Sequence, residues 1–250
     1  MENELTLEKK ANAFRSAQGL GSDDPIRLKS FLTKLNVLTL FKPLSADFSG
    51  MAIKISPTTN SHLRFILVNS NHSLGKQHFT LCHELYHLFI QESFTARTCS
   101  TGLFNKKLDR EEYHADVFAA YLLLPEGGVK SLIPDQELSK NKITLKTLLK
   151  IEQYYSCSRS ALLYRLKNFK LIDDNKYEEF KGSVKRNALL HGFSTELYES
   201  GNADHFIGDY GSVAKELLDR GSISETHFLN LLMDLGFDED NLENIFNDEA

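Results

Sequence analysis

Two kinds of hydrophobic spacing divide the first part of the chain. Residues 5–17 carry apolar side chains at the three- and four-residue spacing of a helix, and Pro25 suits the first turn of a second helix that runs to about Leu35. From residue 37 to 68 the pattern changes to short β-branched or alternating runs separated by Pro, Ser, Asn and Gly. These runs predict three strands of a small sheet, at residues 37–41, 51–55 and 63–68.

The remaining pattern is mostly helical. Residues 76–90 are almost free of helix breakers and form a run too long for a strand, which predicts a helix, and a polar loop is expected at 91–109. Residues 110–124 return to helical spacing and stop at Pro125. Two further helices are predicted at 144–155 and 159–168, with Ser158 as N-cap of the second. The last eighty residues alternate helical pieces with glycine-containing turns.

The composition excludes several classes of protein. The 250 residues are 41% hydrophobic and 25% charged, unlike collagen-like, low-complexity or wholly disordered chains. No apolar run reaches the roughly 18 residues of a membrane span, and the N-terminal segment does not resemble a signal peptide. A net charge of -5 predicts no general attraction to nucleic acid or anionic lipid.

The three cysteines are Cys82, Cys99 and Cys157. Their scattered positions lack the spacing of a disulfide framework or a CxxC zinc site. We interpret them as small apolar or surface residues, and a reducing cytoplasm is the expected location.

The helix predicted at 76–90 contains an HExxH motif, His83-Glu84-Leu85-Tyr86-His87. Residues four apart lie one above the other on one helix face, so His83 and His87 can bind one metal ion. Glu84 can reach a metal-bound water without binding the metal, which is the position of a general base. The alternative is a pair of core histidines satisfied by neighbouring carbonyls, beside a surface glutamate.

A hydrolytic zinc site needs a third protein ligand and an open position for water. Glu111, Glu112 and His114 compete for that place. Glu112 is favoured because it shares one helical stripe with Asp116, and neighbouring alanines let two helices approach closely. Asp116 can accept the free ring N–H of a ligating histidine. We interpret His114 as structural and Glu111 as facing solvent.

These parts predict metal-assisted hydrolysis of a peptide bond. The ion lowers the pKa of its water to about 7 and polarises the carbonyl, while Glu84 takes the proton of the water and returns it to the leaving amine. Zn²⁺ is the expected cofactor, although Mn²⁺ or another divalent ion also suits a His₂Glu set. No side chain is assigned as donor to the oxyanion.

Two motifs together resemble the ImmA/IrrE family of metallopeptidases. Residues 79–87 match F-T-x-x-H-E-x-x-H, and residues 112–125 match E-x-x-A-D/N-x-F-A-A-x-x-L-x-P. The segment Phe48-Ser49-Gly50 also resembles a turn within the sheet of that family, so the resemblance covers about residues 11–172. It departs from the family at His114, where an acidic residue is frequent, and at Tyr86, where a small residue is usual. The resemblance implies a gluzincin-like fold, with His83, His87 and Glu112 as metal ligands and Glu84 as catalytic base.

The resemblance also implies a biological role. Members of the family typically cleave a helix-turn-helix transcriptional repressor, which relieves repression in response to stress, phage or transfer of a mobile element. The expected function is therefore site-specific proteolysis of such a repressor or of a paired regulatory protein. That substrate is the expected partner of the chain. The alternative is a non-proteolytic, DNA-associated regulator or toxin–antitoxin component that acts by binding.

Three regions are expected. They are an α+β, zincin-like metallopeptidase domain at 1–140, a helix-turn-helix-like element at 141–172, and a helical C-terminal region with an acidic tail at 173–250. Between Lys142 and Lys170 the chain has seven Lys or Arg residues and one acid, Glu152. This patch is compatible with DNA contact, but we favour a packed helix pair with solvated basic faces and do not expect DNA binding as the main role. The side chains proposed for such contact are Arg159, Arg165 and Lys167.

Overall fold

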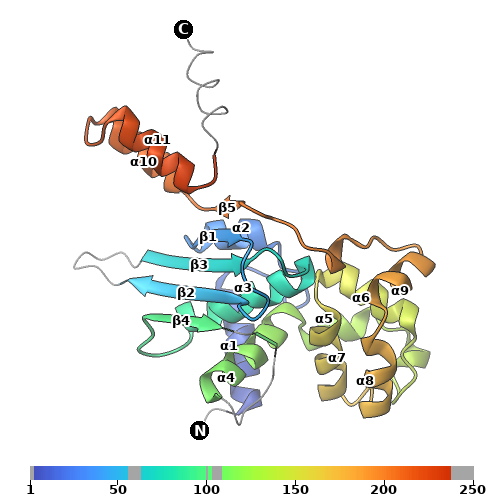
Figure 1. Ribbon diagram of the computed structural model, residues 1–250. Coiled ribbons are helices and arrows are strands. Elements are labelled where there is room, and N and C mark those ends of the chain that lie inside the picture. The colour runs from blue at the N-terminus through green and yellow to red at the C-terminus, as the bar shows by residue number, and fades with distance from the viewer. Residues whose placement is uncertain (1–2, 56–62, 100, 103–108, 238–250) are drawn as a thin grey trace.

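The computed structural model describes residues 3–55, 63–99, 101–102 and 109–237 and has the α+β fold that the sequence predicts (Figure 1). The first half contains four of the five described strands and the longest helices. These elements are α1 (Glu4–Ala17), α2 (Leu28–Lys34), β1 (Leu38–Lys42), β2 (Gly50–Ile55), β3 (Leu63–Asn69), α3 (Leu74–Phe89), β4 (Ala96–Cys99) and α4 (Arg110–Leu123). The second half adds α5 (Glu126–Ser131), α6 (Leu145–Tyr155), α7 (Arg159–Asn168), α8 (Asp174–Lys181), α9 (Val184–Leu190), β5 (Phe206–Ile207), α10 (Tyr210–Asp219) and α11 (Glu225–Asp234).

The strands form one sheet in the order β4-β2-β3-β1-β5. β1 and β3 are parallel, whereas the other neighbours are antiparallel. Strand residues alternate between the two faces, and Ala52, Ile66 and Val68 are buried on the face that packs against α3. The helix that carries HExxH therefore lies directly on the sheet.

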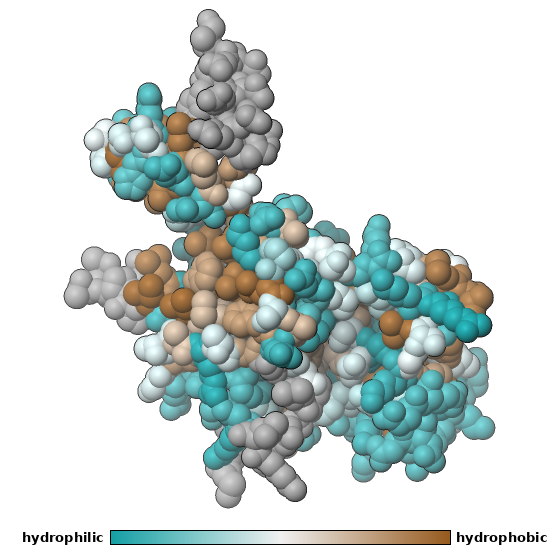
Figure 2. All heavy atoms as spheres, viewed as in Figure 1, coloured by the Kyte–Doolittle hydropathy of each residue, from teal (hydrophilic) through white to brown (hydrophobic). Residues whose placement is uncertain are grey.

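The opposite face of the sheet is also apolar but less covered. Its residues alternate with the buried ones and are only half-buried. Figure 2 shows hydrophobic spheres gathered over this part of the molecule. The residues are Leu38, Leu40, Met51, Ile53, Phe65 and Leu67.

α4 packs against α3 and α1, on the side of α3 away from the sheet (Figure 1). Ala115, Ala119 and Ala120 are fully buried and lack bulky side chains, so the helices approach closely. The side chain of Asp109 accepts hydrogen bonds from the amides of Glu111 and Glu112, which caps α4 at its N-terminus. The cap holds Glu112 in the first turn, beside α3.

Two predicted elements differ from the structure. The second helix begins at Leu28 rather than near Pro25, and β4 lies within the segment expected to be a polar loop. Ala96–Cys99 is polar and short, but it pairs with β2 in antiparallel register, with Arg97 opposite Ala52. Backbone pairing to an existing strand made this segment a strand, and its own hydrophobic pattern did not reveal it.

The C-terminal region returns to the sheet. β5 pairs with β1, and α10 and α11 pack against one another beyond that edge (Figure 1). Within the described residues, no helix has both the length and the apolar character needed to cross a bilayer. The tail residues 238–250 lie outside the described part of the chain, and the domain limits remain a prediction.

Candidate metal centre

The HExxH residues are completely buried where α3 meets α4. His83 and His87 each direct Nε2 toward the other, and the two nitrogens are 3.1 Å apart. The carboxylate of Glu112 approaches them from α4, with Oε2 3.2 Å from His83 Nε2 and Oε1 3.5 Å from His87 Nε2. The structure thus brings together the three residues predicted as metal ligands.

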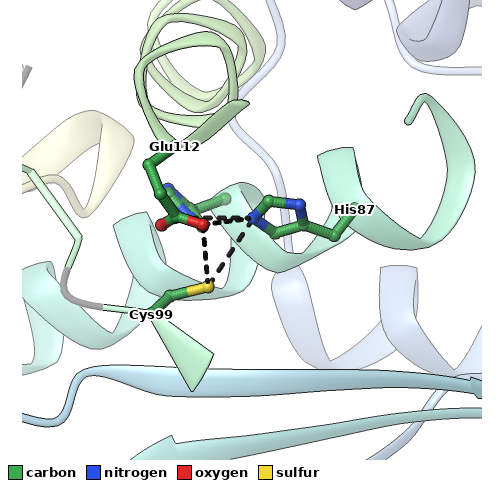
Figure 3. Close-up of side chains that lie close together, drawn as sticks. His87, Cys99 and Glu112 are labelled. Carbon is green, nitrogen blue, oxygen red and sulfur yellow. Dashed lines mark hydrogen bonds and ion pairs between the residues drawn. The ribbon is translucent and has the colours of Figure 1, made fainter. Parts of the chain in front are cut away.

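A fourth donor, the thiol of Cys99, lies at the same place. Its Sγ is 3.6 Å from His87 Nε2 and 3.7 Å from Glu112 Oε1 (Figure 3). The sulfur comes from the end of β4, the imidazole from α3 and the carboxylate from α4. One ligand atom from each of His83, His87, Cys99 and Glu112 falls within 4.8 Å of all the others.

These separations match those around a tetrahedral cation. With bonds of about 2.0–2.1 Å to nitrogen or oxygen and about 2.3 Å to sulfur, ligand atoms around Zn²⁺ lie about 3.3–3.6 Å apart. The site has 3.1 Å between the two histidine nitrogens and 3.7 Å between Cys99 Sγ and Glu112 Oε1. Both values lie within about 0.2 Å of that range, so the donor set suits a divalent metal ion.

Outer hydrogen bonds orient both imidazoles. Asp116 Oδ1 lies 2.9 Å from His83 Nδ1 and also accepts the amide of Gly102 at 2.8 Å. Gln91 Oε1 lies 2.5 Å from His87 Nδ1. A proton on each Nδ1 leaves each Nε2 with a lone pair directed at the centre, which is the tautomer that metal binding requires.

Arg97 fixes the third ligand. Its Nε donates to Glu112 Oε1 at 2.7 Å, and its terminal nitrogen forms an ion pair with Asp109. Because Arg97 and Cys99 are two residues apart on β4, their side chains project from the same side of the strand. This short strand therefore contributes both a donor and the cation that holds Glu112.

Glu84 has the position expected of a proton acceptor. Its carboxylate is fully buried, and Oε1 has no hydrogen-bond partner among the described residues. A Cβ on Gly50 would lie 2.7 Å from that oxygen, so the glycine leaves the space that Glu84 occupies. Burial raises the pKa of Glu84 to about 8, and the nearby Glu112 carboxylate acts in the same direction.

The other members of the cluster are electrostatically coupled. Burial alone would lower the pKa of His83, but its hydrogen bonds, above all that to Asp116, outweigh burial and raise it well above the usual value. Burial, together with the neighbouring His83, lowers the pKa of His87 to about 4. Burial opposes ionisation of Glu112, yet its hydrogen bond to His83 and the nearby charges give a net lowering of its pKa. Hydrogen bonding therefore favours the protonated form of His83, whereas burial disfavours that of His87.

The competing candidates for the third ligand lie elsewhere. His114 is buried on α4, and its Nδ1 is 3.7 Å from Glu111 Oε1 rather than near the centre. Glu111 is partly exposed and accepts a hydrogen bond from the hydroxyl of Tyr86 at 3.1 Å. Tyr86, which departs from the family pattern, packs on Phe118. It therefore lies on the side of α3 that contacts α4.

Two of the three basic residues considered for DNA contact are interior. Arg159 is buried, forms an ion pair with Glu152 and donates to the carbonyl of Phe180. Arg165 is buried between Tyr121 and Phe169 and donates to the carbonyl of Leu124. Of the three, Lys167 has an exposed side chain. These contacts are those of a packed helix pair.

The sequence interpretation missed Cys99 and Arg97. Cys99 is neither at the surface nor a simple apolar filler, because its thiol belongs to the cluster of possible metal ligands. The available signal was the alternation Arg97-Thr98-Cys99, which places the first and third side chains on one face of a strand. That signal is usable only once the segment is known to be a strand.

A known protein family matches the part of the chain that holds this site. The family model of the IrrE N-terminal-like domain, a peptidase family, matches residues 33–167. The matched segment contains β1 to β4, α3 and α4, and so every residue of the cluster. A search of curated proteins found no match.

Proposed function

The chain belongs to the ImmA/IrrE family of IrrE N-terminal-like peptidase domains, and from this premise we propose that it is a zinc-dependent endopeptidase whose substrate is a helix-turn-helix repressor or a paired regulatory protein. The observation that carries the proposal is the unpartnered Oε1 of buried Glu84 beside the cluster of His83, His87 and Glu112. A buried carboxylate oxygen without a donor is costly unless it serves a further group. A water positioned for attack is such a group.

The proposed mechanism assigns a task to each side chain. When bound, a Zn²⁺ ion supplies Lewis acidity, which acidifies a water molecule and polarises the scissile carbonyl. His83, His87 and Glu112 hold the ion, while Asp116 and Gln91 keep the two imidazoles in the required tautomer. Glu84 removes the proton of the attacking water and delivers it to the amine of the leaving peptide. Burial of Glu84 makes it a stronger base than a solvated glutamate, which suits this task.

The sheet offers a place for an extended substrate. β4 is the edge strand next to the cluster, and in the described structure its ladder partner is β2, on one side. A segment of the substrate can add to the other edge through main-chain hydrogen bonds, which supports recognition of an unfolded or extended stretch of a protein. The choice of a helix-turn-helix repressor rests on the family, and such a substrate places the enzyme in the cytoplasm.

The experiment compares cleavage by the wild-type chain and by Glu84→Gln. The substrate tested is a purified helix-turn-helix repressor, chosen first from any such gene adjacent to this one, and cleavage is followed by electrophoresis and by mass spectrometry of the fragments. We expect Glu84→Gln to abolish cleavage while zinc content and circular dichroism stay unchanged. Glu111→Gln is the matched control, because Glu111 lies outside the cluster on the same helix turn as Glu112, and we expect it to retain cleavage.

Two results would contradict the proposal. Full biological activity of Glu84→Gln would favour the alternative, a regulator that acts by binding alone. For the ligand set, zinc content is measured after Glu112→Ala and after His114→Ala. Loss of zinc in the His114 variant alone would overturn the assignment of Glu112.

A further inference from the structure

The backbone of Cys99 is held at the metal centre by the sheet. It lies opposite Gly50 in the β2–β4 ladder, and its carbonyl accepts the amide of Ser49 at 3.0 Å. The side chain is 3% exposed and projects from the same side of the strand as Arg97, which contacts Glu112. The Cα of Cys99 is thus placed by backbone pairing, and the thiol can leave the centre by rotation of its side chain.

The thiol also lies close to the predicted base. Besides the contacts with His87 and Glu112, its Sγ lies 3.7 Å from Glu84 Oε2. The sulfur therefore stands between the ligands and the predicted base, where an attacking water would have to sit. A carbon side chain of similar size would fill the space, but it would offer no donor to a cation.

We propose that Cys99 binds the metal ion as a fourth protein ligand, so that the resting centre is closed and water enters only after the thiolate leaves. The closed resting state rests on the proposed peptidase function. The assignment of Cys99 as a ligand is tested separately, without any assay of cleavage. Zinc sites with four protein ligands, cysteine among them, are typically structural, whereas hydrolytic sites have three and keep one position open. With Cys99 bound, the ion would have four protein ligands and no open position. With Cys99 released, His83, His87 and Glu112 would leave one position for water.

The chemistry of the two states balances simply. On metal binding the thiol loses its proton to solvent and a metal–sulfur bond forms. When the centre opens, the metal–sulfur bond would break and the sulfur would take a proton back from solvent. A water molecule would then occupy the position that the sulfur leaves. No change of oxidation state is needed, and Glu84 then faces water in place of sulfur.

The test of the ligand uses cobalt as a spectroscopic probe. The metal-free full-length chain is loaded with one equivalent of Co²⁺, and the near-ultraviolet sulfur-to-cobalt charge-transfer band is recorded. We expect the band in the wild type and its loss in Cys99→Ala and in Cys99→Ser, the second variant preserving the size of the side chain. Cys157→Ala is the control, because Cys157 is also buried and free but lies in the turn between α6 and α7, outside the cluster.

Zinc affinity provides a second readout. Competition with a chromophoric chelator should show that Cys99→Ala binds zinc about tenfold more weakly or worse, since loss of even an outer-shell partner typically costs 10–100-fold. Absence of the charge-transfer band in the wild type, or its persistence in both Cys99 variants, would overturn the assignment of the ligand.

The closed state is tested by cleavage. Under saturating zinc, Cys99→Ala should show a higher kcat than the wild type, while Cys157→Ala should not. An unchanged or lower kcat in Cys99→Ala, with the charge-transfer band lost, would refute the closed state and leave Cys99 as an ordinary ligand. If neither the wild type nor the variant cleaves, the peptidase proposal fails and the closed state with it, and the cobalt band still decides whether Cys99 binds the metal.

Discussion

Gly50 provides the sharpest test of how the site is packed. It begins β2, lies opposite Cys99 and is buried against α3. A Cβ added there would lie 2.6 Å from Thr80 Cγ2 and 2.7 Å from Glu84 Oε1, with the carbonyl of Leu67 at 3.2 Å. Carbon atoms do not approach so closely, and Thr80, a β-branched residue on a helix, has little rotamer freedom with which to move.

The expected cost of Gly50→Ala follows from two opposing effects. Overpacking of a filled core typically costs about 1–3 kcal/mol. Replacement of glycine by alanine also restricts the unfolded chain and stabilises the protein by about 0.4–1 kcal/mol. Gly182→Ala shows the second effect alone, because Gly182 has an extended backbone and a Cβ there would meet no atom within 4 Å. The difference between the two variants therefore measures overpacking. We therefore expect Gly50→Ala to be about 1–3 kcal/mol less stable than Gly182→Ala.

The assay is urea denaturation of both variants with metal removed by a chelator, so that metal binding does not contribute to stability. Cleavage by the zinc-loaded variants is measured alongside, and Gly50→Ala should lose it because a displacement of about 1 Å at a catalytic group can cost about 100-fold. A stability difference below about 0.5 kcal/mol, the scatter of ordinary surface substitutions, would refute the packing argument.

Three further predictions concern positioning, folding and pH. Asp116→Ala should weaken zinc binding about 10–100-fold in chelator competition, because His83 loses the acceptor that fixes its tautomer. Glu152→Ala should lower the free energy of unfolding by about 3–5 kcal/mol in urea, because Arg159 stays buried without its carboxylate. Burial lowers the pKa of His78 in the folded chain below its usual 6.5. Near and below pH 6.5 the unfolded chain therefore binds more protons than the folded chain, and the free energy of unfolding falls as the pH drops. His78→Gln should flatten that decline by at most about 1.4 kcal/mol per pH unit.

Surface variants serve as controls for the first two of these predictions. Asp219→Ala, on exposed α10, should leave zinc affinity unchanged. Glu179→Ala removes an exposed ion pair with Lys176 and should cost no more than about 1 kcal/mol. Any core variant that behaves like its surface control would contradict the corresponding contact.

Much of the fold was accessible from local pattern. The helix at 76–90 has nearly the bounds of α3, and the helix at 159–168 has those of α7, with Ser158 as its N-cap. The strands at 37–41, 51–55 and 63–68 were likewise placed to within one residue at each end. These elements carry their own signal, because helix caps and strand alternation depend on residues close in sequence.

Other features required contacts between distant segments. β4 is a strand because β2 offers it a ladder, and β5 is one because β1 does. The charge of Arg159 and Arg165 suggested a basic surface, but both guanidinium groups are enclosed by partners from other elements. Charge along a sequence does not reveal burial, because burial depends on what packs above the side chain.

The sequence alone determined the chemistry of α3. The four-residue spacing of His83 and His87 places both imidazoles on one helix face wherever the helix lies, and Glu84 accompanies them by the same periodicity. The stripe on α4 already favoured Glu112, but only the tertiary structure brought it to the two imidazoles and added Cys99 from β4, because their approach depends on helix–helix and strand–strand packing. A helix determines its own geometry through local hydrogen bonds, whereas a site built from several elements depends on how they pack together.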